Sequence, residues 1–124
     1  MTTRDYYNLP QDENGWRMLP NGNKFKLGLD CKIGNNVAIG NNVTIADDVV
    51  IDNGAYIGNN VKIGNGAYIG NGAYIGNNAY ISNRTTIGND VVIGNRAIIG
   101  NGAYIGNGAY IGDGAVLGNS KIYP

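Results

Sequence analysis

Residues 63–74 read IGNGAYIGNGAY, two copies of a six-residue unit that continues along the chain from residue 27 to residue 122. A large aliphatic residue recurs at every sixth position, and a small or β-branched residue stands two positions before it. The residue after the aliphatic one is usually Gly, and Asn or Asp usually follows. Sixteen units follow one another without an inserted loop, so this stretch decides the fold.

The unit at residues 67–72, AYIGNG, shows how each repeat should fold. Ala67 and Ile69 are two positions apart and should point to the same side of a strand, whereas Tyr68 should point to the other side. The Gly-Asn-Gly that follows tolerates the positive φ angles of a tight bend. A strand this short cannot bury its apolar side alone, so successive units must stack. The sequence therefore predicts an all-β protein in which short strands coil into a parallel β-helix.

The pattern [Leu/Ile/Val]-[Gly/Ala/Asp]-x-x-[small]-x resembles that of the hexapeptide-repeat proteins, which form left-handed parallel β-helices. The resemblance covers about three-quarters of the chain and implies a triangular prism with three units in each coil. About five coils would give a prism roughly 25 Å long. The left-handed sense is taken from the family, because connections between parallel strands are otherwise right-handed. Asn at the corners is expected to form amide ladders between the side chains of successive coils.

The sequence divides into an N-terminal cap at residues 1–26, the hexapeptide-repeat β-helix at 27–122 and a C-terminal end at 123–124. The cap does not follow the repeat, and PNGN at residues 20–23 is expected to form the turn of a hairpin. An open β-helix end exposes apolar side chains and unpaired backbone groups. We therefore expect Trp16, Met18 and Leu19 to cover this end, with Trp16 over the first coil. The alternative is that Trp16, Tyr6 and Tyr7 contact a partner. The last coil is expected to be uncovered.

The residue between the two inward positions of each unit should point outward, and three units per coil align these residues in three columns. One column is uncharged from Ala38 to Tyr110, whereas the other two begin with Lys26 and Lys32 and become apolar, and the column of Lys32 is expected to end at Ile122. Tyr and β-branched residues suit strands in general, but a contiguous apolar patch usually marks an interface. The candidate interface residues are Tyr56, Tyr74, Val92, Tyr110, Tyr68 and Tyr104.

The resemblance implies acyltransferases that act on sugars, nucleotide-sugars or amino acids with a His as general base, and a related branch that binds zinc through His. This sequence has no His and one Cys, so the usual base and the usual metal ligands are missing. Asp47, Asp48 and Asp52 stand where the repeat accepts Asp as a turn residue. Cys31 stands at an inward position and is expected to be a core residue. We therefore expect no catalytic residue, no metal site and no cofactor.

Composition restricts the classes of partner. Nine basic and nine acidic residues give a net charge of zero, and the basic residues do not cluster, which argues against nucleic acid. No apolar run is long enough to span a membrane. The first residues lack the apolar core of a signal peptide, so a cytoplasmic location is expected.

These features favour a non-catalytic homo-oligomer, a trimer by resemblance, that acts through flat Tyr-rich faces or through clefts between subunits. A second hypothesis is a protein that binds or sequesters a nucleotide-, sugar- or acyl-CoA-like ligand between subunits, with Arg84 and Arg96 as candidate contacts. The sequence also leaves open a His-independent or degenerate acyltransferase and a structural module of a fibre or tail. Ice binding is disfavoured because the expected array of Thr residues is absent.

Overall fold

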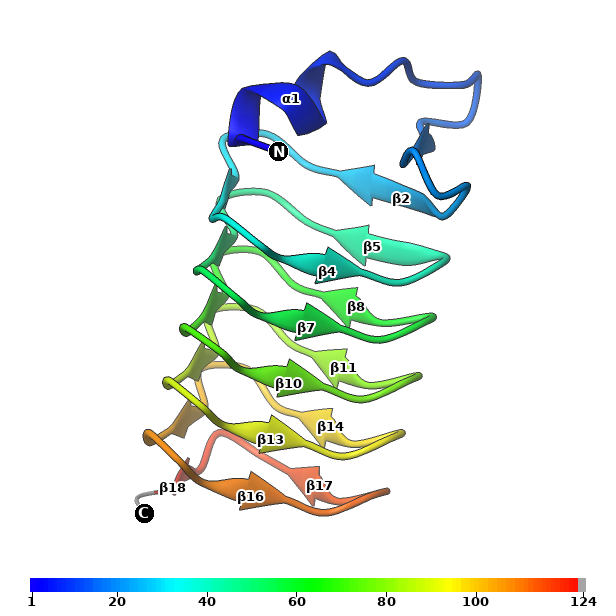
Figure 1. The fold of residues 1–124 in the computed structure, drawn as a ribbon. Helices are drawn as coiled ribbons and strands as arrows, with labels where there is room; N and C mark the ends of the chain where they lie inside the picture. The colour runs from blue at the N-terminus through cyan, green and yellow to red at the C-terminus, as the bar shows by residue number, and fades with distance from the viewer. Residues whose placement is uncertain (123–124) are drawn as a thin grey trace.

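The structure, a computed structural model, describes residues 1–122 and shows three sheets that form the sides of a prism (Figure 1). The first sheet contains, in spatial order, β1 (Arg17–Met18), β2 (Lys24–Leu27), β5 (Val43–Ile45), β8 (Lys62–Ile63), β11 (Tyr80–Ile81), β14 (Ile98–Ile99) and β17 (Val116–Leu117). The second contains β16 (Tyr110–Ile111), β13 (Val92–Ile93), β10 (Tyr74–Ile75), β7 (Tyr56–Ile57) and β4 (Ala38–Ile39). The third contains β18 (Lys121–Ile122), β15 (Tyr104–Ile105), β12 (Thr86–Ile87), β9 (Tyr68–Ile69), β6 (Val50–Ile51) and β3 (Lys32–Ile33).

The chain moves to the next sheet at every unit, so neighbouring strands in a sheet come from successive coils. Tyr74, for example, aligns with Tyr56 in the preceding coil and with Val92 in the following one, and both pairings are parallel. This arrangement confirms the predicted all-β fold, a left-handed parallel β-helix of about five coils. The helix α1 (Thr3–Asn8) lies across the N-terminal end of the prism (Figure 1). No helix in residues 1–122 is long and apolar enough to cross a membrane.

The core is a stack of aliphatic side chains inside the prism. The inward aliphatic position is buried in every coil from Ile33 to Ile111, and the small or β-branched residue beside it closes the remaining space. Burial of one such side chain contributes about 1.5–3 kcal/mol. The stability of the prism therefore comes from many equivalent layers.

The corners explain why Gly follows most inward aliphatic residues. A Cβ atom at Gly40 would lie 2.5 Å from Oδ1 of Asn59 in the next coil, and a Cβ at Gly58 would lie 2.5 Å from Oδ1 of Asn77. Such distances are well inside van der Waals contact, so the close approach of two coils favours Gly here. Two residues later the backbone is left-handed, with φ between 57° and 75° from Asp30 through Gly114.

The Asn ladder forms in a different way from the one expected. The Oδ1 atom of an Asn accepts a hydrogen bond from the backbone N–H one coil earlier, as Asn77 does from Asn59 at 2.8 Å, whereas side-chain to side-chain ladders were expected. The three bonds of 3.0–3.1 Å between coils follow Ala46, Asp52 and Ser82, which stand in the Gly position. The added Cβ atoms therefore separate the coils slightly without breaking the ladder.

The N-terminal end is closed by side chains that take the place of a preceding coil. The hydroxyl of Thr3 donates to the carbonyl of Ile33 and accepts from its N–H, both at 3.0 Å. The hydroxyl of Tyr7 donates to the carbonyl of Gly28 and accepts from the N–H of Cys31. Edge groups that would otherwise be open to pairing are thus satisfied by α1.

The expected hairpin is present, since β1 pairs antiparallel with β2, but the expected cover residue differs. Phe25 is buried and aligns with Val43, so β2 already belongs to the first coil and Phe25 fills its inward position. The strand alternation that points Phe25 inward points Trp16 outward, where Lys26 Nζ lies 4.8 Å from the centre of its ring. Trp16 therefore does not lie over the core, and Tyr6 takes that place.

The last unit is one residue shorter than the others. Ile122 aligns with Ile105 and Lys121 with Tyr104, because five residues separate Leu117 from Ile122. The sequence-based assignment of Ile122 to an outward column is therefore wrong, and Lys121 occupies that position. Residues 123–124, assigned from the sequence to the C-terminal end, lie outside the described residues.

Candidate functional site

One sheet presents a column of uncharged side chains, and we call this surface the tyrosine face. Its members lie in register on β4, β7, β10, β13 and β16, in the order Ala38, Tyr56, Tyr74, Val92, Tyr110. The rings of Tyr56 and Tyr74 stack in parallel, with centroids 4.8 Å apart and planes 3° apart. The spacing equals that of hydrogen-bonded strands, so the ring stack follows directly from the repeat.

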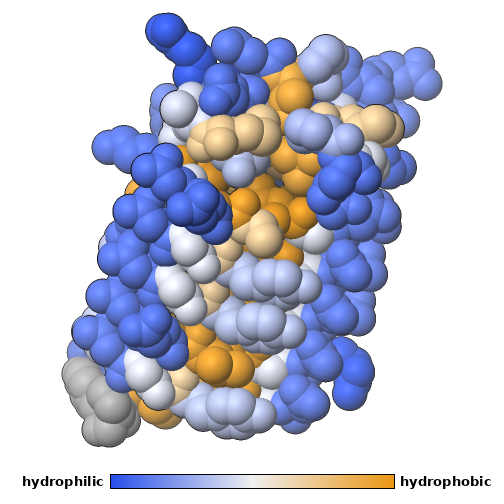
Figure 2. Space-filling view, viewed as in Figure 1, coloured by the Kyte–Doolittle hydropathy of each residue, from blue (hydrophilic) through white to orange (hydrophobic). Residues whose placement is uncertain are grey.

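The tyrosine face is accessible and has a hydrophilic border. The exposed fractions are 44% for Tyr56, 43% for Tyr74 and 71% for Tyr110. Figure 2, which views the molecule from this side, shows strongly hydrophilic residues along both corners and few of them between. The border contains the Asn ladders, in which Asn53 and Asn59 belong to opposite corners.

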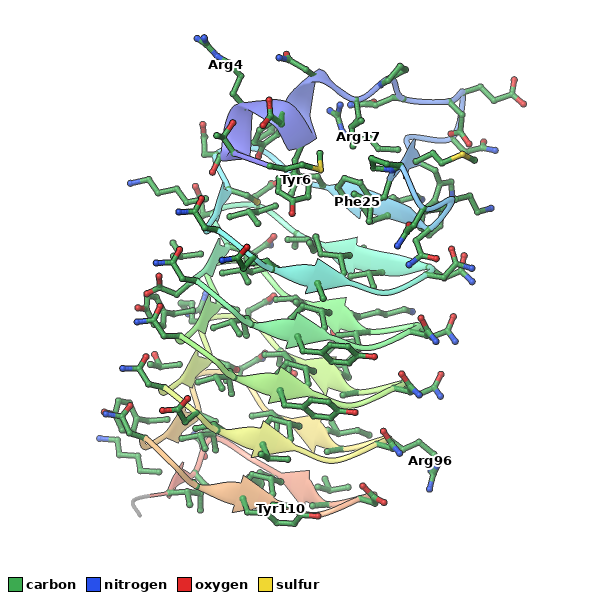
Figure 3. The ribbon with its side chains drawn as sticks, viewed as in Figure 1. Arg4, Tyr6, Arg17, Phe25, Arg96 and Tyr110 are labelled. Carbon is green, nitrogen blue, oxygen red and sulfur yellow. The ribbon has the colours of Figure 1, made fainter. Side chains whose placement is uncertain are left out.

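Charge reaches the edges of this face at the level of β13. Asp90 lies at the corner before Val92 and Arg96 at the corner after Ile93, and both side chains are exposed. Figure 3 shows Arg96 projecting away from its corner into solvent. Arg84 lies at a different corner, which joins the other two sheets, so the structure does not bring the two candidate arginines together.

Both arginines have left-handed backbone, with φ of 57° at Arg84 and 62° at Arg96. A side chain at these angles is disfavoured sterically, and Gly or Asn stands at most of the equivalent positions. Within residues 1–122 neither guanidinium forms an ion pair or a hydrogen bond, so no internal contact explains the choice of Arg.

Tyr68 and Tyr104 lie on another face, because β9 and β15 belong to the third sheet. The Tyr68 hydroxyl donates a hydrogen bond of 2.8 Å to Oδ2 of Asp52. This bond, with burial as a smaller cause, raises the pKa of Tyr68 above its ordinary value. The six candidate interface residues therefore belong to two faces, and the tyrosine face holds four of them.

The three cap residues chosen from the sequence have different environments. Leu19 is buried and belongs to the core cluster, Met18 is 58% exposed, and Trp16 lies on the outer side of the hairpin. Figure 3 shows that Tyr6 descends from α1 beside Phe25, and their rings meet edge to face with centroids 6.0 Å apart. The sequence analysis missed both roles. The position of Phe25, eighteen residues before the inward Val43, is the signal that could have revealed its role.

Arg17 is a further residue that the sequence analysis missed. It is 7% exposed, and its Nη1 donates to the carbonyls of Tyr7 and Leu9 at the C-terminal end of α1. A cation at a helix C-terminus also interacts favourably with the helix dipole. Arg17 therefore holds α1 against the hairpin, and its buried Nε has no hydrogen-bond partner within the described residues.

A hollow of about 470 Å³ opens at the N-terminal end of the tyrosine face, and we refer to it as the hollow. Its floor is formed by residues on and beside β4, its far wall by Tyr56, and its roof by the cap hairpin and α1. Figure 2 shows hydrophobic side chains at this place, in the upper part of the face. The hollow exists because Ala38 stands where the next two rungs carry a Tyr ring.

Among residues 1–122 the remaining reactive groups do not lie together as a site. Burial raises the pKa of the Cys31 thiol, which donates to the carbonyl of Ala46. Asp52 accepts from Tyr68, and Asp47 accepts the backbone N–H of Leu29 as a member of the ladder. In residues 1–122 no three His, Cys, Asp or Glu side chains lie together in a way that could hold a metal ion.

Comparison with known families identifies one clear match. The model of the family described as the EIF2B subunit epsilon LbH domain matches residues 19–122. This range begins in the turn that follows β1 and contains β2 and the whole β-helix, and LbH denotes the left-handed β-helix. No curated protein matches the sequence.

Solved structures share the fold at low sequence identity. The acetyltransferase domain of PglB from Neisseria gonorrhoeae superposes with a TM-score of 0.73 at 19% identity, over 75% of this chain and 46% of that one. WeeI from Acinetobacter baumannii gives 0.71 at 17% identity, over 85% and 53%. A hexapeptide transferase family protein from Anaplasma phagocytophilum gives 0.60 at 20% identity, over 83% and 65%. The chain thus spans roughly half to two-thirds of the length of these proteins, and the likeness shows the fold alone.

Proposed function

Since the chain belongs to the family of the EIF2B subunit epsilon LbH domain, we propose that it acts as a rigid, non-catalytic β-helical subunit that associates with copies of itself through the tyrosine face. The observation that carries the proposal is the uncharged column from Ala38 to Tyr110, with its stacked pair Tyr56 and Tyr74. A flat, contiguous patch of this kind is typical of interfaces. Tyr suits such a surface because its ring supplies a large contact area with little loss of side-chain entropy.

The two charged edges of the face support an arrangement of parallel prisms. When copies are related by a rotation axis that runs parallel to the prism in front of the tyrosine face, the edge that carries Asp90 in one copy meets the edge that carries Arg96 in the next. Asp90 of one copy would then face Arg96 of its neighbour at the same height. Such complementarity favours one register over others. A trimer, the assembly implied by the resemblance to hexapeptide-repeat proteins, satisfies this geometry.

The test replaces one ring on the tyrosine face and a matched ring elsewhere. Tyr74→Lys should shift the mass in solution toward that of a monomer, whereas Tyr80→Lys, at 44% exposure on the first sheet, should leave it unchanged. Sedimentation velocity at micromolar concentration measures the mass, and circular dichroism checks that both variants fold. A wild-type chain that sediments as a monomer would contradict the proposal.

A charge exchange tests the register of the assembly. Asp90→Arg or Arg96→Asp alone should weaken association by placing like charges opposite each other. The double variant should restore it, because every interface in a homo-oligomer then carries the exchanged pair. If the double variant associates no better than the single ones, the two residues do not meet across the interface.

The second candidate function is acyl transfer, favoured by the names of two structural relatives, an acetyltransferase domain and a hexapeptide transferase family protein. The sequence has no His to serve as the general base that the resemblance implies. We expect purified protein to transfer no acetyl group from acetyl-CoA to amino-sugar or amino-acid acceptors. Acetylated product above the rate without protein, identified by mass spectrometry, would replace the non-catalytic proposal.

A further inference from the structure

We propose that the hollow binds a neutral planar aromatic ring, which stacks on the side of Tyr56 that faces away from Tyr74. The two Tyr rings are parallel at 4.8 Å, which is the distance between successive coils. Ala38 aligns with Tyr56 in the next rung of the same column and carries no ring. The hollow is therefore one missing step of an aromatic stack, and a flat molecule can continue the stack there.

The burial of the coil residues marks the same opening. The inward position that stands two residues before each aliphatic residue is buried from Phe25 to Ala109 with one exception. Val37 is only half-buried. Val37 and Ile39 on either side of Ala38 line the floor, and Leu19 lines the roof. A volume of about 470 Å³ is within the roughly 300–1,000 Å³ of small-molecule sites. The cap therefore leaves this part of the first coil open.

The lining indicates the chemistry of the ring. Among the described residues no Asp, Glu, Lys or Arg side chain lines the hollow, so no charged side chain is there to pair with a charged ring. The polar groups at its rim are the amides of Asn21, Asn36 and Asn59, and Asn23 donates to the carbonyl of Ile39. The Oδ1 atoms of Asn21 and Asn59 already accept one backbone N–H each, so their NH₂ groups and remaining lone pairs are left for a molecule in the hollow. Amides can donate and accept hydrogen bonds along the edge of a flat molecule. The site therefore suits an uncharged heterocycle with donors and acceptors on its edge, of which a purine nucleoside is an example.

The hollow opens at one end of the tyrosine face, so it adjoins the proposed interface, but the two proposals are measured by different experiments. The hollow lies at the rung of Ala38, three rungs from Val92, where the charged edges of the proposed interface lie. A failure of ring binding would leave the mass of the oligomer unchanged, and a monomeric wild type would leave the ring site intact. Sedimentation and ligand titration therefore report on the two proposals separately.

The experiment fills the empty rung and compares it with a filled one. Ala38→Tyr should place the protein's own ring on Tyr56, whereas Val92→Tyr adds the same ring to the same column away from the hollow. Adenosine serves as the probe, with ribose as the non-aromatic control, in a titration followed by the amide resonances of Val37, Ala38 and Tyr56. We expect saturable shifts with adenosine alone. Since stacking and its loss change affinity by roughly tenfold or more, Ala38→Tyr should weaken binding at least about tenfold and Val92→Tyr should not.

Tyr56→Ala provides a second variant in case Ala38→Tyr disturbs the fold. It removes the stacking surface without filling the hollow, and it should also lose binding at least about tenfold. Circular dichroism and thermal melting show whether each variant keeps the β-helix. The proposal is wrong if adenosine causes no saturable shift at millimolar concentration, if ribose binds equally well, or if the folded Ala38→Tyr and Tyr56→Ala variants bind like the wild type.

Discussion

The coils and the cap satisfy the same physical demands by opposite means. In the coils, each backbone group and each apolar side chain meets its counterpart one turn away, as Asn77 meets Asn59 and Ile75 meets Ile57. In the cap, single side chains replace a whole coil: Tyr6 covers the core, and Thr3 and Tyr7 close the backbone edge. The coils are therefore redundant, whereas each contact of the cap is present once. Damage should cost more in the cap than at matched positions in the coils.

The largest effect should follow from removal of the ring that covers the core. Tyr6 is 4% exposed and meets Phe25 edge to face, so Tyr6→Ala should lower the free energy of unfolding by about 3–5 kcal/mol. Urea unfolding monitored by circular dichroism measures this change. Tyr80→Ala is the matched control in the coils, because Tyr80 is 44% exposed and should lose less than about 1 kcal/mol. Equal losses in the two variants would show that the cap is no more sensitive than the coils.

A smaller loss should follow from removal of one hydroxyl. Thr3→Val keeps the shape of the side chain but leaves the N–H and the carbonyl of Ile33 without their partner, at a cost of about 1–3 kcal/mol. Thr44→Val changes an outward Thr within β5 and should cost little, because Val suits a strand. The same unfolding experiment compares them. Faster amide exchange at Ile33 in Thr3→Val would locate the lost contact at the edge.

Cys31 lies where cap and coils meet and should give stability a dependence on pH. Burial raises the pKa of its thiol above the ordinary value of 9.0 in the folded protein. The folded state therefore resists ionisation of this thiol. The contribution of the protonated thiol to the free energy of unfolding is fully present below that ordinary value and is lost as pH rises toward the higher pKa of the folded state. The slope approaches about 1.4 kcal/mol per pH unit for one proton. Unfolding midpoints at pH 7 and pH 9.5 should separate more in the wild type than in Cys31→Val.

The smallest effect should be a gain within the coils. Arg84 has φ of 57°, which disfavours a side chain, while Gly tolerates it but loses more entropy on folding. Arg84→Gly should therefore raise stability by up to about 1 kcal/mol, and Arg96→Gly, at 62°, should behave alike. Arg4→Gly, in α1, is the opposite control and should destabilise by about 0.5–1 kcal/mol. A loss in both corner variants would indicate that the arginines make contacts outside this chain.

The difference between the two regions also explains which features the sequence predicts. The repeat places Ile69 inward and Tyr68 outward by its period alone, so the fold and the columns follow from counting. The cap has no period, and its contacts depend on two features that a search for repeats overlooks. These are the capping box of Thr2 and Asp5, which begins α1, and the strand alternation that turns Trp16 outward.

Within the repeat, one wrong prediction and one feature that was not predicted also have specific causes. The five-residue spacing of Leu117 and Ile122 was visible in the sequence, and following the aliphatic residues instead of a strict count of six would have turned Ile122 inward. The hollow could not be predicted, because it depends on the height at which the hairpin crosses the first coil. The sequence shows that Ala38 lacks a ring, but it does not show that the cap leaves the space beside it open.

The Gly–Asn contact joins residues nineteen positions apart, as in Gly40 with Asn59, and nearly every unit supplies both partners. Duplication or loss of three units in the gene would rejoin the ladder without a mismatch and change the length of the molecule by one coil, about 4.8 Å. Duplication or loss of a single unit would turn everything downstream by a third of a revolution and move Val92 and Tyr110 to another side. Replication slippage in such a repetitive gene can therefore lengthen or shorten the protein, but its aromatic column survives only changes that come in multiples of three.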